Sequence, residues 1–379
     1  MRIAIINLTR GGISGGYKKY LLNIIPRMAI NVNLKSILCA SPASLKVQDW
    51  FEPYDNVKFM DCLPFRLFGY NDTTLRQELE KFSPDVIFIP VERYLSFKNV
   101  PVVNMIQNML PMVSIPNNTL KELFRNFVQK CIAERAVKQS QRVIAVSTFV
   151  KEYLSSEWSL SPKQIGLVYH GIDFDEEVTE RPDMIPSDWD NHYLFTAGSI
   201  DPYRGLEDIF LAMKLLSEQN NIDIKLVIAG DVRPAMLSYW EKLKKRIQRL
   251  DIFPNVYWAG KLSEKEMSWC YQNCQAFIMS SRVEACPNIA LESLSNGCIS
   301  ISANNPPLPE FYGDTAIYYT SNDEKSLVEA VLHMLNIGEG QRRSMSEKAR
   351  QRASNFSWDK TVERTITELK EAIYCAAQN

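Results

Sequence analysis

The stretch Ala276-Phe277-Ile278-Met279-Ser280-Ser281-Arg282-Val283-Glu284-Ala285-Cys286-Pro287-Asn288-Ile289-Ala290-Leu291-Glu292 predicts a buried strand, a loop and the first turns of a helix. Glu284 then lies on the loop at the carboxyl end of the strand, and Glu292 lies about one and a half turns into the helix. Loop amides and a helix N-terminus favour anions. Two carboxylates around such a cradle predict a site for a sugar that carries a diphosphate. The alternative is an exposed loop residue and a solvated helix residue.

Short apolar runs of the same kind recur along the 379 residues. Separated by amphipathic helices, they predict parallel sheets covered on both faces, which is an α/β fold class. The predicted strands of the first half are residues 2–7, 34–39, 57–60, 85–89, 102–106, 142–146 and 165–169. Those of the second half are residues 193–197, 224–229, 256–258, 276–279, 298–302 and 316–319.

A break separates the two halves. Residues 173–190 are acidic, contain Pro182 and Pro186, and have no hydrophobic period, so they predict a linker. A chain of this length is long for a single core. We therefore expect an N-terminal domain over residues 1–172 and a C-terminal domain over residues 191–356.

Composition excludes several classes of protein. A net charge of −1 gives no general attraction to nucleic acid. No apolar run approaches the roughly 18 residues that a membrane span needs. The N-terminal segment turns polar too early for a signal peptide. The prediction is a cytoplasmic protein without a nucleic-acid partner.

A metal site is not predicted. The eight cysteines are scattered, and none of the three histidines is near Cys270 and Cys274, which are four residues apart on a predicted helix. Asp173-Phe174-Asp175 and Asp188-Trp189-Asp190 have the spacing of a D-x-D metal motif. Because both fall at or in the acidic linker, we interpret them as solvated acids.

Glycines follow the first predicted strand, in Gly11-Gly12-Ile13-Ser14-Gly15-Gly16. Such a loop lets the backbone approach a ligand closely. The spacing is not G-x-G-x-x-G, and no acidic residue ends the second strand to bind a ribose, so NAD binding is disfavoured. The alternative is a flexible turn.

Several motifs together resemble a known family. Glu284 and Glu292 form E-x7-E, and Asn296-Gly297-Cys298-Ile299-Ser300 follows. This is similar to the signature of the GT-B-fold retaining glycosyltransferases of family 4, also called glycosyl transferases group 1, and the resemblance covers nearly the whole chain. It implies two Rossmann-like, doubly wound domains that face each other across a cleft. It also implies that a last helix, at about residues 357–379, crosses back to the first domain.

The resemblance also implies residue roles. The segment from Ala197 to Leu206 is similar to the family's G-R-x4-K-G element, whose cations neutralise a leaving diphosphate. Arg204 holds the lysine place, and Ser199 stands where many members have arginine, which halves the cationic clamp. Donor binding is thereby assigned to Gly15, Gly16, Ser199, Arg204, Glu284, Cys286, Pro287, Asn288, Ile289 and Glu292.

Many members of the family have a histidine at the end of the fifth strand, where this chain has Gln107 and Asn108. An amide can position a hydroxyl but cannot act as a general base near neutral pH. This fits a same-face mechanism in which the β-phosphate of the donor takes the acceptor proton. The implied catalytic residues are Glu284, Arg204 and Asn108. For Asn108, a polar strand-end cap is the alternative.

The implied function is a retaining, metal-independent hexosyl transfer without a cofactor. The sugar moves from a nucleoside-diphosphate sugar to a hydroxyl of a saccharide or lipid-linked saccharide, in cell-surface polysaccharide biosynthesis. A sugar-nucleotide epimerase of the same fold and a non-catalytic nucleotide- or saccharide-binding subunit are the alternatives.

Basic residues are frequent on two predicted helices, within residues 121–142 and 242–249. They form either solvated faces or surfaces for anionic lipid. If they are surfaces for anionic lipid, the protein is expected to contact the inner face of the membrane peripherally.

Overall fold

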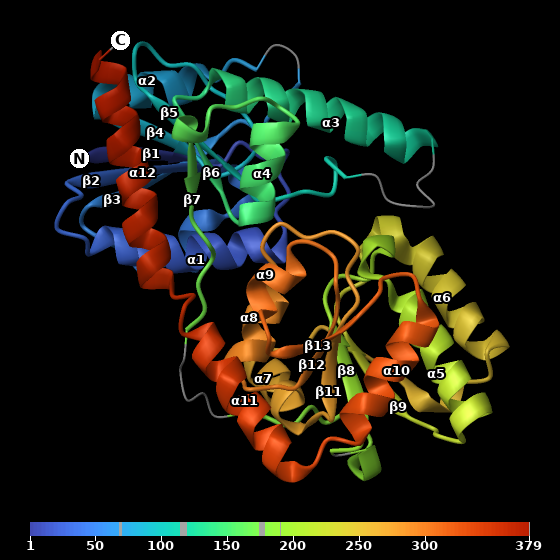
Figure 1. Ribbon diagram of the computed structural model, residues 1–379. Helices are drawn as coiled ribbons and strands as arrows, with labels where there is room; N and C mark the ends of the chain where they lie inside the picture. Colours follow the sequence, from blue (N-terminus) through green and yellow to red (C-terminus); the bar gives the residue numbers. More distant parts are fainter. Residues whose placement is uncertain (68–69, 114–119, 174–178, 190, 379) are drawn as a thin grey trace. The chain divides into compact units, whose positions relative to one another are not determined.

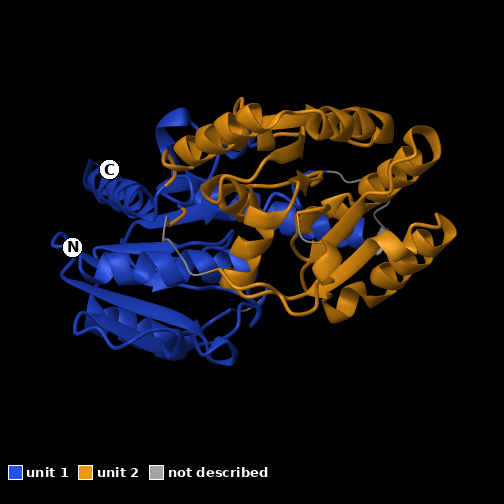
Figure 2. Ribbon diagram, turned by 90° about the horizontal axis from the view of Figure 1, so that it is seen from below, with its two compact units in different colours: residues 1–171, 357–379 blue, residues 172–356 orange. Residues whose placement is uncertain are grey.

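The computed structural model describes residues 1–67, 70–113, 120–173, 179–189 and 191–378. The chain forms two compact units (Figure 2). Unit 1 contains residues 1–171 and 357–379, and unit 2 contains residues 172–356. The last helix of the chain therefore belongs to the unit that contains the N-terminus.

Unit 1 is built on a seven-stranded sheet in the order β3-β2-β1-β4-β5-β6-β7, in which every pairing is parallel (Figure 1). Its strands are β1 (Arg2–Ile6), β2 (Ser36–Pro42), β3 (Val57–Cys62), β4 (Val86–Ile89), β5 (Val102–Ile106), β6 (Arg142–Ala145) and β7 (Ile165–Leu167). Its α-helices are α1 (Gly15–Ala29), α2 (Thr73–Phe82), α3 (Leu120–Gln139), α4 (Thr148–Ser156) and α12 (Trp358–Gln378).

Unit 2 has a six-stranded parallel sheet in the order β10-β9-β8-β11-β12-β13. Its strands are β8 (Tyr193–Ala197), β9 (Lys225–Ala229), β10 (Val256–Gly260), β11 (Ala276–Met279), β12 (Ser300–Ala303) and β13 (Ala316–Tyr319). Its α-helices are α5 (Leu206–Asn220), α6 (Leu237–Arg249), α7 (Glu264–Asn273), α8 (Asn288–Ser295), α9 (Leu308–Tyr312), α10 (Glu324–Leu335) and α11 (Glu339–Ala353).

Short 3-10 turns connect some of these elements. They are η1 (Ala43–Leu45), η2 (Val47–Trp50), η3 (Pro162–Gln164), η4 (Ser187–Trp189), η5 (Pro202–Arg204), η6 (Pro234–Met236) and η7 (Phe253–Asn255). Of these, η5 ends at Arg204 and leads into α5.

Both sheets reverse their strand order beside their first strand. In unit 1 the reversal lies between β1 and β4, and in unit 2 it lies between β8 and β11. Helices cover both faces of such a sheet, so ligands of doubly wound folds bind outside the carboxyl ends of the strands at this reversal. The loops after β1 and β4, and those after β8 and β11, are therefore where each unit is expected to carry chemistry.

Helix α12 completes the core of unit 1. It packs against α1, β4, β5 and β6. Trp358, Ile366 and Leu369 on its apolar face are buried. The Trp358 ring lies 6.2 Å from that of Tyr20, and the guanidinium Nε of Arg142 donates to Glu368 at 2.6 Å. Burial of this stripe fixes the C-terminal segment to the first unit.

The predicted fold class is confirmed, and each strand predicted from an apolar run is present. The predicted strand at residues 34–39 is shifted, since β2 runs from Ser36 to Pro42. Its parallel pairing with β3 continues past the apolar run, to Pro42 opposite Cys62. Helix α9, of five residues beside Pro307, was not predicted, because it is too short to show a helical period.

Candidate active site

Two neighbouring strands of unit 2 bring the central residues together. The loop after β8 ends with Arg204, and the loop after β11 contains Glu284. Because β8 and β11 are adjacent in the sheet, their carboxyl ends lie side by side. Residues 80 positions apart in the sequence therefore become neighbours.

Arg204 and Glu284 form a largely buried ion pair. Nη1 of Arg204 donates to Oε1 of Glu284 at 2.6 Å and to Oγ of Ser281 at 3.1 Å. The exposed fractions of the two charged side chains are 16% and 13%. The guanidinium carbon lies 4.9 Å from the ring centroid of Tyr203. These contacts hold the guanidinium in one orientation.

The charge of Arg204 is secured by its surroundings. Burial lowers the pKa of the guanidinium, but the negative charge of Glu284, followed by Tyr203 and Asp201, outweighs burial and raises it. Nε of Arg204 and Oδ2 of Asp201 are buried and have no hydrogen-bond partner within the described part of the chain. A buried, charged donor without a partner is costly unless a ligand satisfies it.

Glycine backbone makes this close packing possible. Gly205 has φ +65°, and a Cβ there would lie 2.4 Å from the carbonyl oxygen of Ser280. The hydroxyl of Ser280 in turn donates to the carbonyl of Arg204 at 2.6 Å. Without a glycine at 205, the two loops could not approach so closely.

Glu292 is the fifth residue of α8 and is held by a buried tyrosine. The hydroxyl of Tyr271 donates to Oε2 of Glu292 at 3.2 Å. Burial, followed by the negative charge of Glu292, raises the pKa of Tyr271 well above its usual value. Tyr271 therefore stays protonated and continues to donate, which restricts the orientation of the Glu292 carboxylate.

The loop that joins Glu284 to α8 contains the other predicted donor residues. Pro287 is the N-cap of α8, with extended backbone and no side-chain capping bond. Cys286 before it is partly buried, and Asn288 and Ile289 form the first turn. The predicted placement of these residues at a helix N-terminus thus agrees with the observed secondary structure.

Ser199, which stands where many members of the family have arginine, lies on the loop after β8. Its Oγ is 3.3 Å from the hydroxyl of Tyr203. A second cation nearby was missed by the sequence analysis: Arg233, after β9, forms an ion pair with Asp201, and 58% of its side chain is exposed. No family motif singles out this residue; only its position after an apolar strand could have suggested it.

The remaining predicted site residues lie in unit 1. Gly15 and Gly16 begin α1, where Oγ of Ser14 accepts from the amide of Tyr17 at 3.2 Å. Asn108 is exposed, and its side-chain oxygen accepts from the amide of Leu110 at 3.0 Å. That bond is the strand-end cap that the sequence also allowed.

Unit 1 also contains a carboxylate that the sequence analysis missed. Oε1 of Glu92, after β4, accepts from the amides of Gln107 and Asn108 at 2.9 and 3.1 Å. Burial raises the pKa of Glu92, although these backbone bonds lower it in part. Its position directly after the apolar run of β4 was the available signal.

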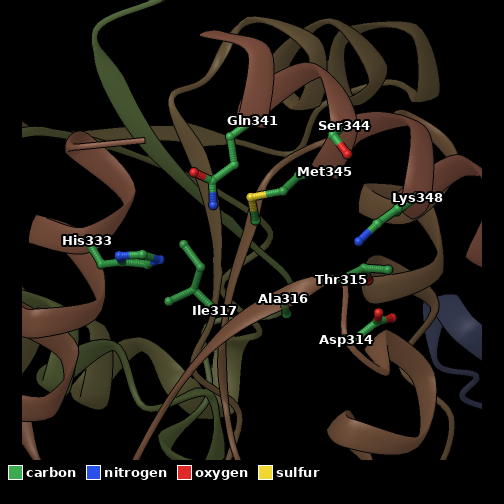
Figure 3. Close-up of a pocket in the computed structure, with 9 residues that line it drawn as sticks. All are labelled: Asp314, Thr315, Ala316, Ile317, His333, Gln341, Ser344, Met345 and Lys348. Atoms are coloured by element: carbon green, nitrogen blue, oxygen red, sulfur yellow. The ribbon is translucent and has the colours of Figure 1, made fainter. Parts of the chain in front are cut away.

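A cavity of about 320 Å³ in unit 2 lies away from these loops (Figure 3). It is lined by the segment from Asp314 to Ile317, by His333 of α10, and by α11 residues that include Gln341 and Lys348. Because Asp314 and Thr315 precede β13, the cavity lies at the amino end of that strand. Arg204 lies at the other end of the parallel strands, the carboxyl end.

The structure describes only part of the two D-x-D segments. Asp188 is exposed and pairs with Lys225 at 3.3 Å, and Asp173 is exposed. Phe174, Asp175 and Asp190 lie outside the described residues. Within the described ranges, there is no group of three or more acidic, histidine or cysteine side chains that could hold a metal ion.

None of the helices in the described residues is both long enough and apolar enough to cross a bilayer.

Comparison with known proteins agrees with this architecture. The structure of Anabaena Alr3699/HepE in complex with UDP and glucose matches with a TM-score of 0.73 and 16% identity, over 98% of this chain and 99% of that one. WaaG, a glycosyltransferase involved in lipopolysaccharide biosynthesis, matches with a TM-score of 0.70 and 12% identity, over 97% of this chain and 99% of that one. The fold is therefore that of the GT-B glycosyltransferases.

Sequence comparison places the chain within that class. The family model for Glycosyltransferase Family 4 matches residues 15–176, and the model for Glycosyl transferases group 1 matches residues 179–352. The chain belongs to this glycosyltransferase family.

Two relatives match nearly the whole chain. The O-antigen chain mannosyltransferase RfbU of Salmonella typhimurium is 20% identical over 86% of this chain and 89% of its own length. The second is the N-acetylgalactosamine-N,N'-diacetylbacillosaminyl-diphospho-undecaprenol 4-alpha-N-acetylgalactosaminyltransferase of Campylobacter jejuni. It is 20% identical over 90% of this chain and 93% of its own length.

The loop geometry yields a stability prediction. Gly230 has φ +145°, and a Cβ there would lie 1.8 Å from the carbonyl oxygen of Gly198. We expect Gly230→Ala to lower the free energy of unfolding by about 3 kcal/mol or more, from backbone strain and overpacking. Gly260→Ala is the control, because φ is +67° there but no atom lies within 4 Å, so only about 1 kcal/mol is expected. Equal losses in urea unfolding would contradict the close approach of the loops.

Proposed function

We propose that this glycosyltransferase is retaining and metal-independent, and that it moves a hexosyl group from a nucleoside-diphosphate sugar to a saccharide hydroxyl. The observation that carries the proposal is the buried, charged guanidinium of Arg204, whose Nε has no hydrogen-bond partner among the described residues. It lies at the carboxyl ends of β8 and β11, where the strand order of unit 2 reverses. A guanidinium can bind two phosphate oxygens at once, and this edge is where doubly wound domains bind nucleotides.

Each part of the sugar-nucleotide donor then has a protein group that binds it. Arg204 binds the diphosphate, and Arg233 supplies the second cation that Ser199 does not. The amino end of α8, with Cys286, Pro287, Asn288 and Ile289, adds a partial positive charge. For Gly15 and Gly16 of unit 1, donor binding stays a prediction. No cofactor is required by this scheme.

The two glutamates bind opposite ends of the donor. Glu292, oriented by Tyr271, accepts from the ribose hydroxyls. Arg204 occupies only Oε1 of Glu284, so Oε2 can accept from a hydroxyl of the sugar. The negative charge of Glu284 also stabilises positive charge that develops on the sugar ring in the transition state.

The proposed reaction takes place on one face of the sugar. The bond between the anomeric carbon and the phosphate oxygen breaks, and its electron pair goes to the β-phosphate. The acceptor oxygen bonds to the same face of the anomeric carbon, and its proton passes to a β-phosphate oxygen. Asn108 positions the acceptor hydroxyl. Arg204 stabilises the diphosphate as its charge increases, which lowers the barrier.

The activities of the two relatives support a role in surface polysaccharide synthesis. One relative acts on the O-antigen chain and the other on a saccharide linked to diphospho-undecaprenol. We infer an acceptor of this class, a saccharide or a lipid-linked saccharide, and a cytoplasmic location.

Release of nucleoside diphosphate from a panel of sugar nucleotides tests the proposal, with the anomeric carbon of the product analysed by NMR. We expect an acceptor-dependent product with the donor's anomeric configuration, and no effect of a chelator. An inverted product would contradict retention. Conversion of the donor without acceptor would indicate an epimerase, and binding without turnover would indicate a binding subunit.

Arg204 has a role that substitution can measure. Arg204→Ala should lower kcat by a factor of about 100 or more, because a preorganised donor to the leaving group is lost. Arg204→Lys should retain part of the rate. The control is Arg343→Ala, since Arg343 is an exposed arginine of α11 that pairs with Glu339. Near-normal turnover of a folded Arg204→Ala variant, with folding checked by its Tm, would exclude the proposed role.

Helix α3 offers a surface for the predicted membrane contact. Phe124 and Phe127 are 71% and 64% exposed, and Arg125, the residue after Phe124, is also exposed. Aromatic side chains beside a cation suit the interface of an anionic bilayer. We infer docking at the inner face of the membrane, where a lipid-linked acceptor would be reached.

Vesicle sedimentation measures this contact. Replacing both Phe124 and Phe127 by serine should weaken binding to vesicles that contain phosphatidylglycerol by about tenfold. Phe253→Ser, at a 59% exposed phenylalanine of unit 2, serves as the matched control. Wild-type binding that is absent, or unchanged by the double substitution, would exclude α3 as the docking surface.

A further inference from the structure

A second fixed group of polar residues lies in unit 1, outside the carboxyl ends of β1, β4 and β5. The loop after β4 is held by Asn104, which is fully buried in β5. Its Nδ2 donates to the carbonyl of Arg93 at 2.7 Å, and its Oδ1 accepts from Ser140 at 2.8 Å. A buried amide that is used in this way keeps the loop in a single conformation.

Glu92 is presented by this loop. Its Oε1 accepts hydrogen bonds from the two backbone amides that follow β5, those of Gln107 and Asn108. Gln107 returns a bond from Nε2 to the carbonyl of Pro90 at 2.9 Å. Besides these two amides, the backbone amide of Glu92 itself is the one described group that donates to the carboxylate. The carboxylate is therefore held in position by backbone amides, and the partly exposed side chain can still accept from a ligand.

Two arginines belong to the loops after β1 and β4. Nη1 of Arg93 donates to the carbonyl of Glu92 at 2.6 Å, and its guanidinium carbon lies 5.2 Å from the ring centroid of Phe65. The amide of Phe65 donates to the carbonyl of Thr9 at 2.8 Å, which ties the loop after β1 to the same place. Arg10, the next residue of that loop, is exposed.

Neither of these cations is in a close ion pair. Neither Arg10 nor Arg93 forms an ion pair within 4.0 Å with another residue that the structure describes. Burial lowers the pKa of Arg93; Glu92 opposes this effect, and the positive charge of Arg10 adds to it. An anion between the arginines would relieve this repulsion, whereas a neutral sugar would not.

We propose that this polar cluster of Arg10, Glu92 and Arg93 binds a phosphate-bearing acceptor, with the two arginines on the phosphate oxygens and Glu92 accepting from an acceptor hydroxyl. Guanidinium groups match phosphate geometry, and a carboxylate suits a hydroxyl donor. The inference rests on the proposed function, because it assigns the acceptor class of the same reaction. A sugar phosphate and a lipid-diphosphate saccharide share this chemistry.

Calorimetric titration of the full chain distinguishes a sugar phosphate from a lipid-diphosphate saccharide as the acceptor. The probes are a hexose 1-phosphate, the same hexose linked through a diphosphate to a short prenyl chain, and its methyl glycoside, each with and without UDP. The phosphate-bearing probes should bind at least about tenfold more tightly than the methyl glycoside. A preference for the prenyl probe would assign the lipid-linked source, and equal binding of both phosphates would assign the phosphate alone.

Variants separate the roles of the residues. Arg93→Gln and Arg10→Gln should remove the preference for phosphate, whereas Arg93→Lys should retain part of it. Glu92→Gln should weaken all three probes alike. Lys35→Gln removes the same charge before β2, at the amino edge of the sheet, and should change nothing. A Tm close to that of the wild type confirms that each variant is folded.

Two results would overturn the inference: no binding of any probe, or a phosphate preference that survives both arginine substitutions. Hydrolysis of the donor sugar nucleotide in water and UDP binding report separately on the proposed function. If the wild-type chain shows neither, the proposed function fails, while the titrations without UDP still decide whether the cluster of Arg10, Glu92 and Arg93 binds phosphate.

Discussion

The ion pair between Arg204 and Glu284 is the contact on which the candidate site depends. Taking both charges largely out of water costs more than an exposed pair would, and removing either partner leaves an uncompensated buried charge. Ser281 and the ring of Tyr203 fix the guanidinium, and Gly205 allows the two loops to meet. The pair is thereby preorganised, so binding of the proposed diphosphate would need little reorganisation.

The parallel sheet places comparable chemistry in both units. In unit 2 the loops after β8 and β11 carry Arg204 and Glu284, and in unit 1 the loops after β1 and β4 carry Arg10 and Glu92. In each case a carboxylate and a cation lie where the strand order reverses. The two units differ in how the charge is balanced: Glu284 is paired with Arg204, whereas Glu92 is held by backbone amides.

The local hydrophobic pattern of the sequence was sufficient to predict the strands, because buried parallel strands are continuous apolar runs. It also placed Glu284 on a loop and Glu292 on a helix. The pairing of Arg204 with Glu284 depends on the adjacency of β8 and β11, which no local period reveals. Tyr271, Arg233 and Glu92 belong to no motif, and their roles arise only from side chains that meet across loops.

A crystal structure of the chain with UDP is the most direct measurement of the central claim. The account predicts diphosphate oxygens within about 3.2 Å of Nε or an Nη of Arg204, with Glu292 accepting from the ribose. A nucleotide whose phosphates bind elsewhere, leaving Arg204 engaged only with Glu284 and Ser281, would contradict it.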